Sequence, residues 1–285
     1  MSIPIIDTHQ HLWDPTRFSY SWMADQPSIR RRSLVSEYRE ATAGFDIVRT
    51  VYVDTDVDVH DLAGEVRFIF ELADDPANRI DGVVPGAKLE NPEAFLPLQP
   101  FLNHPKLKGV RRILQSEPDS VSEQPQFVSN VQALAQYGLS FDLCVRARQL
   151  PLARKLVQRC PDVHFILDHC GVPDIKGGGL DPWRSEVKAI AAEPNVSCKL
   201  SGLVAYVDPH RWTDRDLRPY TDHVLDCFGW DRVMWGGDWP VCTLTCPLST
   251  WIETALRLTE NASAAQRDQL FRRNAERIYR LSPPS

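Results

Sequence analysis

Eight short apolar segments, separated by helix-forming patterns, are the feature that most constrains the fold of this 285-residue chain. The segments are rich in Val, Ile, Leu and Phe, as expected for strands that are buried on both faces of a sheet. They cover Ile3–Thr8, Arg49–Val53, Ile80–Ala87, Leu107–Ile113, Leu139–Val145, His164–Asp168, Val196–Leu200 and Arg232–Gly236.

Several of the intervening stretches carry apolar residues at helical spacing. Such stripes predict helices over Asp58–Ala73, Phe127–Tyr137 and Leu150–Arg159. Two more helices are predicted from their start signals. Asp181 before Pro182 resembles an N-cap with proline in the first turn, for a helix that runs to Ala192. Ser263 and Gln266 have the spacing of a capping box, for a helix that runs through Ile278.

Strand and helix patterns that alternate eight times over this length predict a (β/α)8 barrel, an α/β fold, as a single domain over residues 1–285. The long irregular stretch Asp14–Ser33 follows the first strand and is predicted to be an insertion that covers the barrel mouth. The main alternative is a doubly wound open sheet. That fold usually has a glycine-rich phosphate turn after its first strand, where this chain has His9-Gln10-His11.

Composition excludes several classes of function. The formal net charge is −6 and the only basic cluster is Arg30–Arg32, so no nucleic-acid partner is expected. No apolar stretch approaches the roughly 18 residues of a membrane span, and no signal peptide is recognisable at the N-terminus. The seven cysteines are odd in number and lack CxxC spacing, which predicts reduced thiols in a cytoplasmic protein.

His9 and His11 are the first candidates for chemistry. Alternate residues of a strand point to the same face, so the two imidazoles should project side by side at the carboxyl end of the first strand. Active sites of parallel α/β barrels lie at this end. Taken alone, an HxH pair is explained equally well by two surface histidines after a short strand.

Ionisable residues also stand at the ends of other predicted strands. They are Arg111 and Arg112, Asp142, Asp168 and His169, Lys199, and Asp238. An ionisable group in an apolar strand costs several kcal/mol unless it is paired or solvated in a site. Five strands with such groups at the same end therefore predict a shared pocket. The alternative is a set of internal salt bridges that fix barrel packing, for example between Arg111 and Asp142.

Three motifs in this order, HxH at 9–11, LDHCG at 167–171 and GGDWP at 236–240, resemble the amidohydrolase-2 branch of the amidohydrolase superfamily. Within that branch the chain is most similar to sugar-lactone hydrolases of the L-fuconolactonase and L-rhamnonolactonase type. The resemblance covers essentially the whole chain and is also carried by IIDTHQHLWDP at 5–15, LKGVRRILQ at 107–115, LSFDLCVR at 139–146, FILDHCGVPDI at 165–175, VSCKLSGL at 196–203, DLRPYTDH at 216–223 and MWGGDWPVC at 234–242.

The resemblance implies a barrel that hydrolyses its substrate with an activated water. It also implies a metal site in which the ligands match His9, His11, His169 and Asp238. Metal-rich branches place a bridging Lys or Glu on the fourth strand and a His on the fifth. This chain has Arg111 and Arg112 on the fourth strand and Asp142 and Cys144 on the fifth. We therefore expect one divalent ion at most, with zinc as the expected metal, or no metal requirement at all.

The predicted reaction is hydrolysis of a small-molecule sugar lactone. Asp238 is the expected base, and His169 and Lys199 are expected to polarise the carbonyl or to protonate the leaving oxygen. His9 and His11 are expected to bind either the metal or the carbonyl oxygen. The remaining predicted substrate contacts are Asp142, one of the pair Arg111 and Arg112, and the aromatic side chains Trp13 and Trp239, with Trp22 as a further stacking candidate. A metal-dependent decarboxylase and a non-catalytic sugar-binding barrel remain as alternatives.

Overall fold

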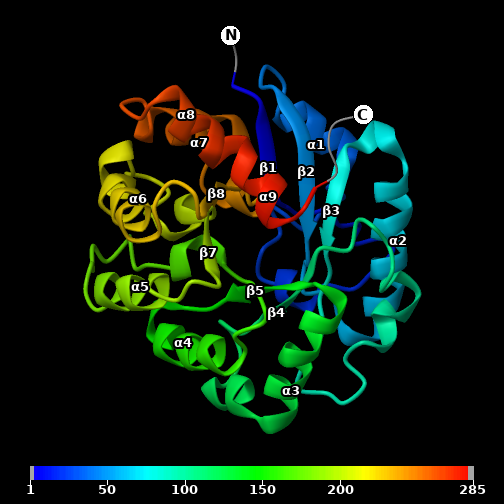
Figure 1. Ribbon diagram of the computed structural model, residues 1–285. Coiled ribbons are helices and arrows are strands. Elements are labelled where there is room, and N and C mark those ends of the chain that lie inside the picture. Colours follow the sequence, from blue (N-terminus) through cyan, green and yellow to red (C-terminus); the bar gives the residue numbers. More distant parts are fainter. Residues whose placement is uncertain (1–2, 282–285) are drawn as a thin grey trace.

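The structure is a computed structural model that describes residues 3–281. All eight predicted strands are present in it, and every strand pair within its sheets is parallel (Figure 1). The strands are β1 (Ile5–Gln10), β2 (Ile47–Val53), β3 (Ile80–Val84), β4 (Gly109–Ile113), β5 (Ser140–Cys144), β6 (Phe165–Leu167), β7 (Val196–Leu200) and β8 (Val233–Trp235).

Two sheets, β1-β2-β3 and β4-β5-β6-β7-β8, are joined into a barrel by short parallel bridges. Val83 pairs with Leu107 between β3 and the start of β4, and Lys108 N–H donates to the Val83 carbonyl over 3.0 Å. On the other side Gln10 pairs with Trp239 beyond β8. With these bridges the ring of strands runs from β1 to β8 and back to β1, which confirms the predicted barrel over the open sheet.

Helices surround the strands, as Figure 1 shows. They are α1 (Val35–Ala41), α2 (Leu62–Asp74), α3 (Pro125–Ala133), α4 (Leu150–Arg159), α5 (Trp183–Ala191), α6 (Asp214–Phe228), α7 (Leu248–Leu258), α8 (Ala264–Asp268) and α9 (Asn274–Ile278). Among residues 3–281 no helix is both long enough and apolar enough to cross a bilayer.

The predicted helix starts have mixed outcomes. Ser263 accepts a hydrogen bond from Gln266 N–H over 3.2 Å, so the predicted capping box is confirmed. The helix that follows is interrupted by a π-helical turn at Gln269–Arg273. The predicted cap at Asp181 is wrong, because Pro182 occupies the N-cap position and the helix has no side-chain cap. The stretch 91–104 contains Pro92, Pro97 and Pro100, and its only helical part is the 3-10 segment Leu96–Phe101.

α9 packs against the apolar residues inside the barrel. Ile278 and Tyr279 join a buried cluster with Ile6 of β1, Val51 of β2 and Ile166 of β6. The base of the barrel is therefore filled with side chains, and the opposite end, where the strands reach their carboxyl termini, is left for a site.

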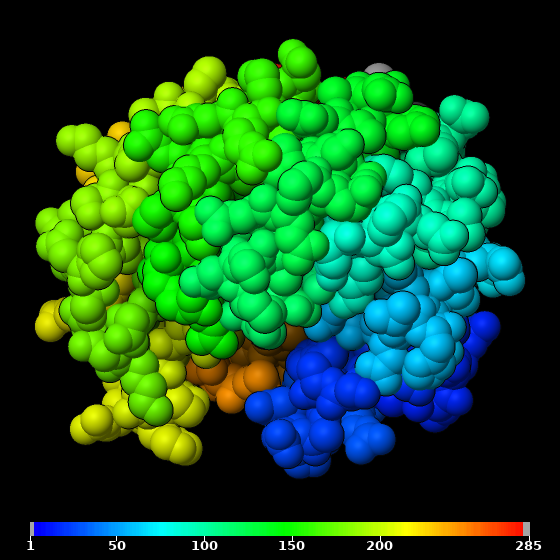
Figure 2. Space-filling model, turned by 90° about the horizontal axis from the view of Figure 1, so that it is seen from below, coloured from blue at the N-terminus to red at the C-terminus, as the bar shows by residue number. Residues whose placement is uncertain are grey.

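The insertion Asp14–Ser33 lies at that opposite end. Trp13 pairs with Ser33 at its two ends, and Tyr20 OH donates to Glu65 of α2 over 3.0 Å. Figure 2 views this face, where the dark-blue insertion lies beside the orange segment after β8, with the green segments after β4 and β5 across from them. The insertion thus borders the barrel mouth, which it was predicted to cover.

Candidate active site

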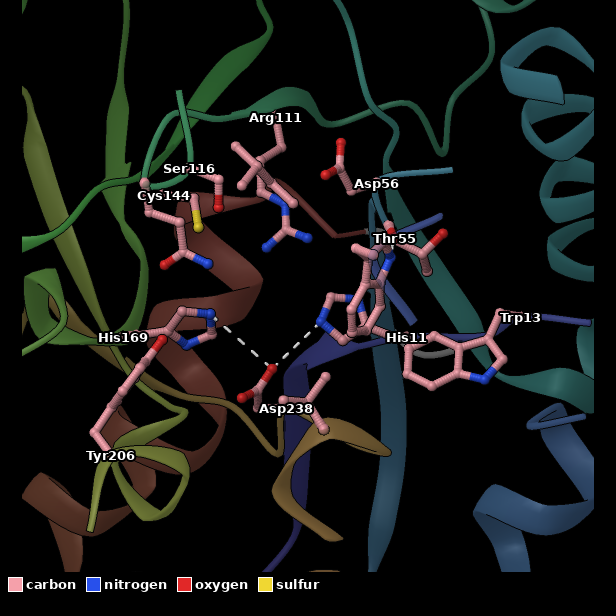
Figure 3. Close-up of a pocket in the computed structure, with 14 residues that line it drawn as sticks. His11, Trp13, Thr55, Asp56, Arg111, Ser116, Cys144, His169, Tyr206 and Asp238 are labelled. Carbon is pink, nitrogen blue, oxygen red and sulfur yellow. Dashed lines mark hydrogen bonds and ion pairs between the residues drawn. The ribbon is translucent and has the colours of Figure 1, made fainter. Parts of the chain in front are cut away.

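A cavity of about 170 Å³ opens at the carboxyl ends of the strands (Figure 3). It is smaller than the roughly 300–1,000 Å³ of pockets that hold drug-sized ligands, so it suits a single small ring. Its walls combine ionisable, polar and apolar side chains from most of the barrel. The lining residues are His11, Trp13, Trp22, Thr55, Asp56, Arg111, Ile113, Gln115, Ser116, Cys144, His169, Tyr206, Asp238 and Val241.

Asp238 is the point at which three imidazoles converge. Its Oδ1 atom lies 3.3 Å from His11 Nε2, 3.7 Å from His9 Nε2 and 4.0 Å from His169 Nε2. Figure 3 shows His11 and His169 on either side of the Asp238 carboxylate, with the cavity above them. The HxH, LDHCG and GGDWP motifs, which are far apart in sequence, therefore supply one cluster.

The backbone holds Asp238 and His169 in unusual conformations. Their φ angles are +55° and +52°, in the left-handed region that residues other than glycine rarely adopt. Two close approaches need glycine: a Cβ on Gly202 would lie 2.4 Å from His169 Nδ1, and a Cβ on Gly237 would lie 2.4 Å from Asp7 Oδ2. Strained residues persist where surrounding contacts over-determine them, as they do in many active sites.

Asp7 is one of the contacts that hold this turn, and the sequence analysis missed it. Its buried carboxylate accepts hydrogen bonds from Gly237 N–H over 2.7 Å, His9 N–H over 2.9 Å and Tyr38 OH over 2.7 Å. Burial raises the pKa of Asp7, and these donors oppose that shift. Asp7 thus ties β1 to the turn that carries Asp238.

The tautomer of His11 indicates what can bind between the imidazoles and Asp238. His11 Nδ1 lies 2.9 Å from the Val53 carbonyl oxygen, which only accepts, so Nδ1 carries a proton. In neutral His11 the Nε2 lone pair then faces the Asp238 oxygen, and two acceptors confront each other. A proton on Nε2 or a cation between the two atoms removes this conflict. An imidazole whose other nitrogen donates to a backbone carbonyl, beside a carboxylate, is typical of a zinc ligand set.

His9 lies below the cavity, deeper in the barrel than His11, and charged groups surround it. Its Nε2 atom is 3.2 Å from Arg111 Nη1, and its Nδ1 atom is 3.3 Å from Lys199 Nζ and 3.5 Å from Asp168 Oδ1. Burial, followed by the charge of Lys199, lowers the pKa of His9 well below its usual range. His9 is therefore neutral, and its Nε2 lone pair accepts from Arg111.

A buried ionic network lies directly beneath His9. Lys199 Nζ contacts Asp142 Oδ2 over 2.6 Å and Asp168 Oδ1 over 3.1 Å, and Tyr279 OH donates to Asp142 over 2.7 Å. Burial raises the pKa of Asp142, and Lys199 offsets only part of that shift. At Asp168 burial acts in the same direction, but Lys199, His9 and Arg111 together hold the pKa well below its usual range.

Several predicted contacts need correction. Lys199 and Asp142 are fully buried below the cavity, so they can reach a substrate only through His9 or Asp168. Arg112 points away from the cavity and pairs with Glu90 over 2.7 Å and Glu117 over 2.9 Å. Trp239 is buried against Tyr38, with ring centroids 5.5 Å apart.

Arg111 is thus the arginine of the pair that lines the cavity. The suggested Arg111–Asp142 salt bridge is absent among the described residues. Arg111 instead contacts Asp168 Oδ2 over 3.4 Å, Asp54 Oδ2 over 3.6 Å and the Asp54 carbonyl. Asp54 and Asp56 follow the apolar run of β2 and were missed, although an acid directly after a buried strand is the same signal that identified Asp238.

Comparison with known proteins agrees with these motifs. The family model described as Amidohydrolase matches residues 6–281. An L-fucono-1,5-lactonase from Burkholderia multivorans is 32% identical over 98% of this chain and 97% of its own length, and one from Burkholderia ambifaria is 29% identical over 98% and 97%. The crystal structure of an amidohydrolase from Burkholderia multivorans with bound zinc is 31% identical and has a TM-score of 0.89, over 98% of this chain and all of that chain.

Proposed function

The chain belongs to the amidohydrolase family, and from that premise we propose that it hydrolyses the cyclic ester of a sugar acid to the open aldonic acid. The observation that carries the proposal is the Asp238 carboxylate, which faces a cavity the size of one small ring beside His11, His169 and Arg111. A base, a proton donor and a cation around one ring are what hydrolysis of an activated ester requires.

In the proposed mechanism Asp238 is the general base. A water held by its carboxylate gives a proton to Asp238 as the water oxygen bonds to the lactone carbonyl carbon. Asp238 can hold this orientation because its backbone N–H donates to the His9 carbonyl over 2.8 Å and its carbonyl accepts from Cys242 N–H over 2.8 Å.

The tetrahedral intermediate then collapses with cleavage of the bond to the ring oxygen. Arg111 stabilises the negative charge that develops on the carbonyl oxygen, since it is the arginine that lines the cavity. His169 Nδ1–H donates to the Ser201 hydroxyl over 2.9 Å, so Nε2 carries a lone pair toward Asp238. Burial lowers the pKa of His169, so the imidazole is neutral at this stage; its Nε2 takes from Asp238 the proton that came from the water and passes it to the ring oxygen.

The donor set also fits one divalent ion. His11 and Asp238 would hold it, with His9 and His169 beside them. The ligand atoms of His9, His11 and Asp238 all lie within 4.8 Å of one another, close enough to bind one ion. When bound, such an ion supplies Lewis-acid polarisation and acidifies a bound water. A second group of possible ligands, His9, Asp168 and His169, shares His9 with the first, and Arg111 and Lys199 already contact His9 and Asp168, so we propose one ion at most.

The proposed substrates are lactones of six-carbon deoxy sugar acids of the L-fucose and L-rhamnose type. Support comes from the Burkholderia relatives named L-fucono-1,5-lactonase. The enzyme would then act in the breakdown of such a sugar. Seven free cysteines fit a reducing compartment, and we propose the cytoplasm.

A panel of lactones tests this function. We expect L-fucono- and L-rhamnono-lactones to be opened well above their spontaneous rates, as measured with a pH indicator in weak buffer. The same preparation, loaded with zinc, should release no carbon dioxide from hydroxybenzoates. Turnover of the aromatic acids without lactone hydrolysis would establish the alternative, a decarboxylase. Lactone binding by calorimetry without any turnover would establish a sugar-binding barrel.

Metal dependence gives a second prediction. We expect at most one zinc per chain by elemental analysis, and lactonase activity that largely survives chelation, because Arg111 and His169 supply charge and a proton without an ion. His11→Asn should reduce the bound zinc, since it removes the Nε2 ligand. Two tightly held ions per chain, with activity abolished when they are removed, would contradict this prediction.

A further inference from the structure

Asp56 stands on the cavity wall opposite Asp238, at the carboxyl end of β2 (Figure 3). Its φ angle is +53°, so among the residues that line the cavity it shares the left-handed conformation with His169 and Asp238. Those two lie at the proposed reaction centre. The proposed mechanism gives Asp56 no role, although Asp56 also lines the cavity from a left-handed backbone conformation.

Asp56 is held by contacts with residues that lie outside the cavity lining. Lys88 Nζ lies 3.2 Å from Asp56 Oδ1 and does not line the cavity. Asp56 N–H donates to Asp54 Oδ1 over 3.0 Å, and Asp54 in turn binds Arg111. Within residues 3–281 no donor is within hydrogen-bond distance of Asp56 Oδ2, so one oxygen is anchored and the other is available to a ligand.

The loop around Asp56 is also preorganised. Trp22 Nε1–H donates to the Thr55 carbonyl over 2.8 Å, and the Thr55 hydroxyl donates to the buried Glu65 over 2.5 Å. A carboxylate held in place in this way loses little conformational entropy when it accepts a hydrogen bond. Anchoring therefore makes Asp56 suitable for recognising one hydroxyl group at one position.

We infer that Asp56 is the specificity-determining residue that accepts a hydrogen bond from a ring hydroxyl on the side of the lactone away from its carbonyl. This inference rests on the proposed lactonase function and deepens it. An anionic acceptor at this position selects neutral polyhydroxylated lactones. It disfavours a lactone that carries a carboxylate at this position, because the substrate carboxylate and the Asp56 carboxylate repel each other and neither has a proton to donate.

Three lactones measured on the protein and on two variants test the inference. The substrates are L-fucono-1,5-lactone, unsubstituted δ-valerolactone and a monolactone of a six-carbon aldaric acid, which carries the second carboxylate. Asp56→Asn keeps the shape and tolerates the left-handed backbone but removes the charge. Asp25→Asn makes the same chemical change at an exposed position that does not line the cavity, and it serves as the control.

For Asp56→Asn we expect kcat/KM on L-fucono-1,5-lactone to fall roughly tenfold to a hundredfold, the range for losing a hydrogen bond to a charged group. The value on δ-valerolactone should stay within about threefold, and the aldaric lactone should gain relative to the neutral sugar lactone. The control Asp25→Asn should leave kcat/KM on all three lactones within about threefold, because Asp25 is exposed in the insertion and does not line the cavity.

Equal losses on all three lactones in Asp56→Asn would overturn the inference and show that Asp56 only supports the loop, and the same loss in Asp25→Asn would also overturn it. An unchanged profile in Asp56→Asn would overturn it as well. Failure of the proposed function is a different result, since the unmodified protein would then open none of the three lactones.

Discussion

Asp238→Asn is expected to lower kcat for lactone hydrolysis by roughly a hundredfold or more, the usual scale for losing a general base. Asparagine keeps the shape of the side chain and tolerates the φ of +55° at this position, so the turn should survive. The amide cannot take a proton from water. The loss should therefore appear in kcat, while the melting temperature changes little.

Steady-state kinetics on L-fucono-1,5-lactone, with a melting curve for each protein, checks this prediction. Asp25→Asn is a suitable control, because Asp25 is exposed in the insertion and does not line the cavity. Near-normal kcat in Asp238→Asn would move the base to another residue, with His169 as the first candidate. An Asp238→Asn protein that fails to fold would show that Asp238 is primarily structural.

Lys199→Met should cause the largest loss of stability. The substitution keeps the length of the side chain but leaves Asp142 and Asp168 buried without the ammonium they share. Breaking a buried ion pair by removing one partner typically costs about 3–5 kcal/mol. In a chain of this size that corresponds to a fall in melting temperature of roughly 10 °C.

Urea unfolding and melting curves of Lys199→Met, beside the exposed control Lys155→Met, provide the measurement. The double variant Lys199→Met/Asp142→Asn should regain part of the stability, because it removes the charge of Asp142, whereas Asp168 keeps its contact with Arg111. It also supplies a measurement if the single variant does not fold. A Lys199→Met protein as stable as the parent would contradict the buried network described here.

The fold was largely predictable because each strand of the barrel is buried on both faces and is therefore a compact apolar run. Strand ends were less predictable. β1 continues to Gln10, so His9 belongs to the strand and lies beneath the cavity, whereas His11 lines it. The register between β1 and β2 also shifts once between Asp7 and Gln10, and such a shift depends on pairing with β2, which the sequence does not reveal.

The sequence predicted which residues form the candidate site better than it predicted how their side chains are arranged. The motifs identify His11, His169 and Asp238, which the cavity brings together. Alternation along β4 implies that only one of Arg111 and Arg112 points inward, but register against β3 and β5 decides which. Lys199 was expected at the cavity, yet its long side chain runs inside the barrel toward Asp142, which also accepts a hydrogen bond from Tyr279 near the C-terminus.

The rate at which the purified protein opens L-fucono-1,5-lactone tests the central claim most directly. Proton NMR follows lactone and aldonate separately, and a buffer blank gives the spontaneous rate. We predict complete conversion to the aldonate with catalytic amounts of protein, at a rate proportional to protein concentration and reduced nearly to the blank in Asp238→Asn. Conversion at the spontaneous rate for this lactone and for its L-rhamnono counterpart would contradict the assignment of lactonase activity to this cavity.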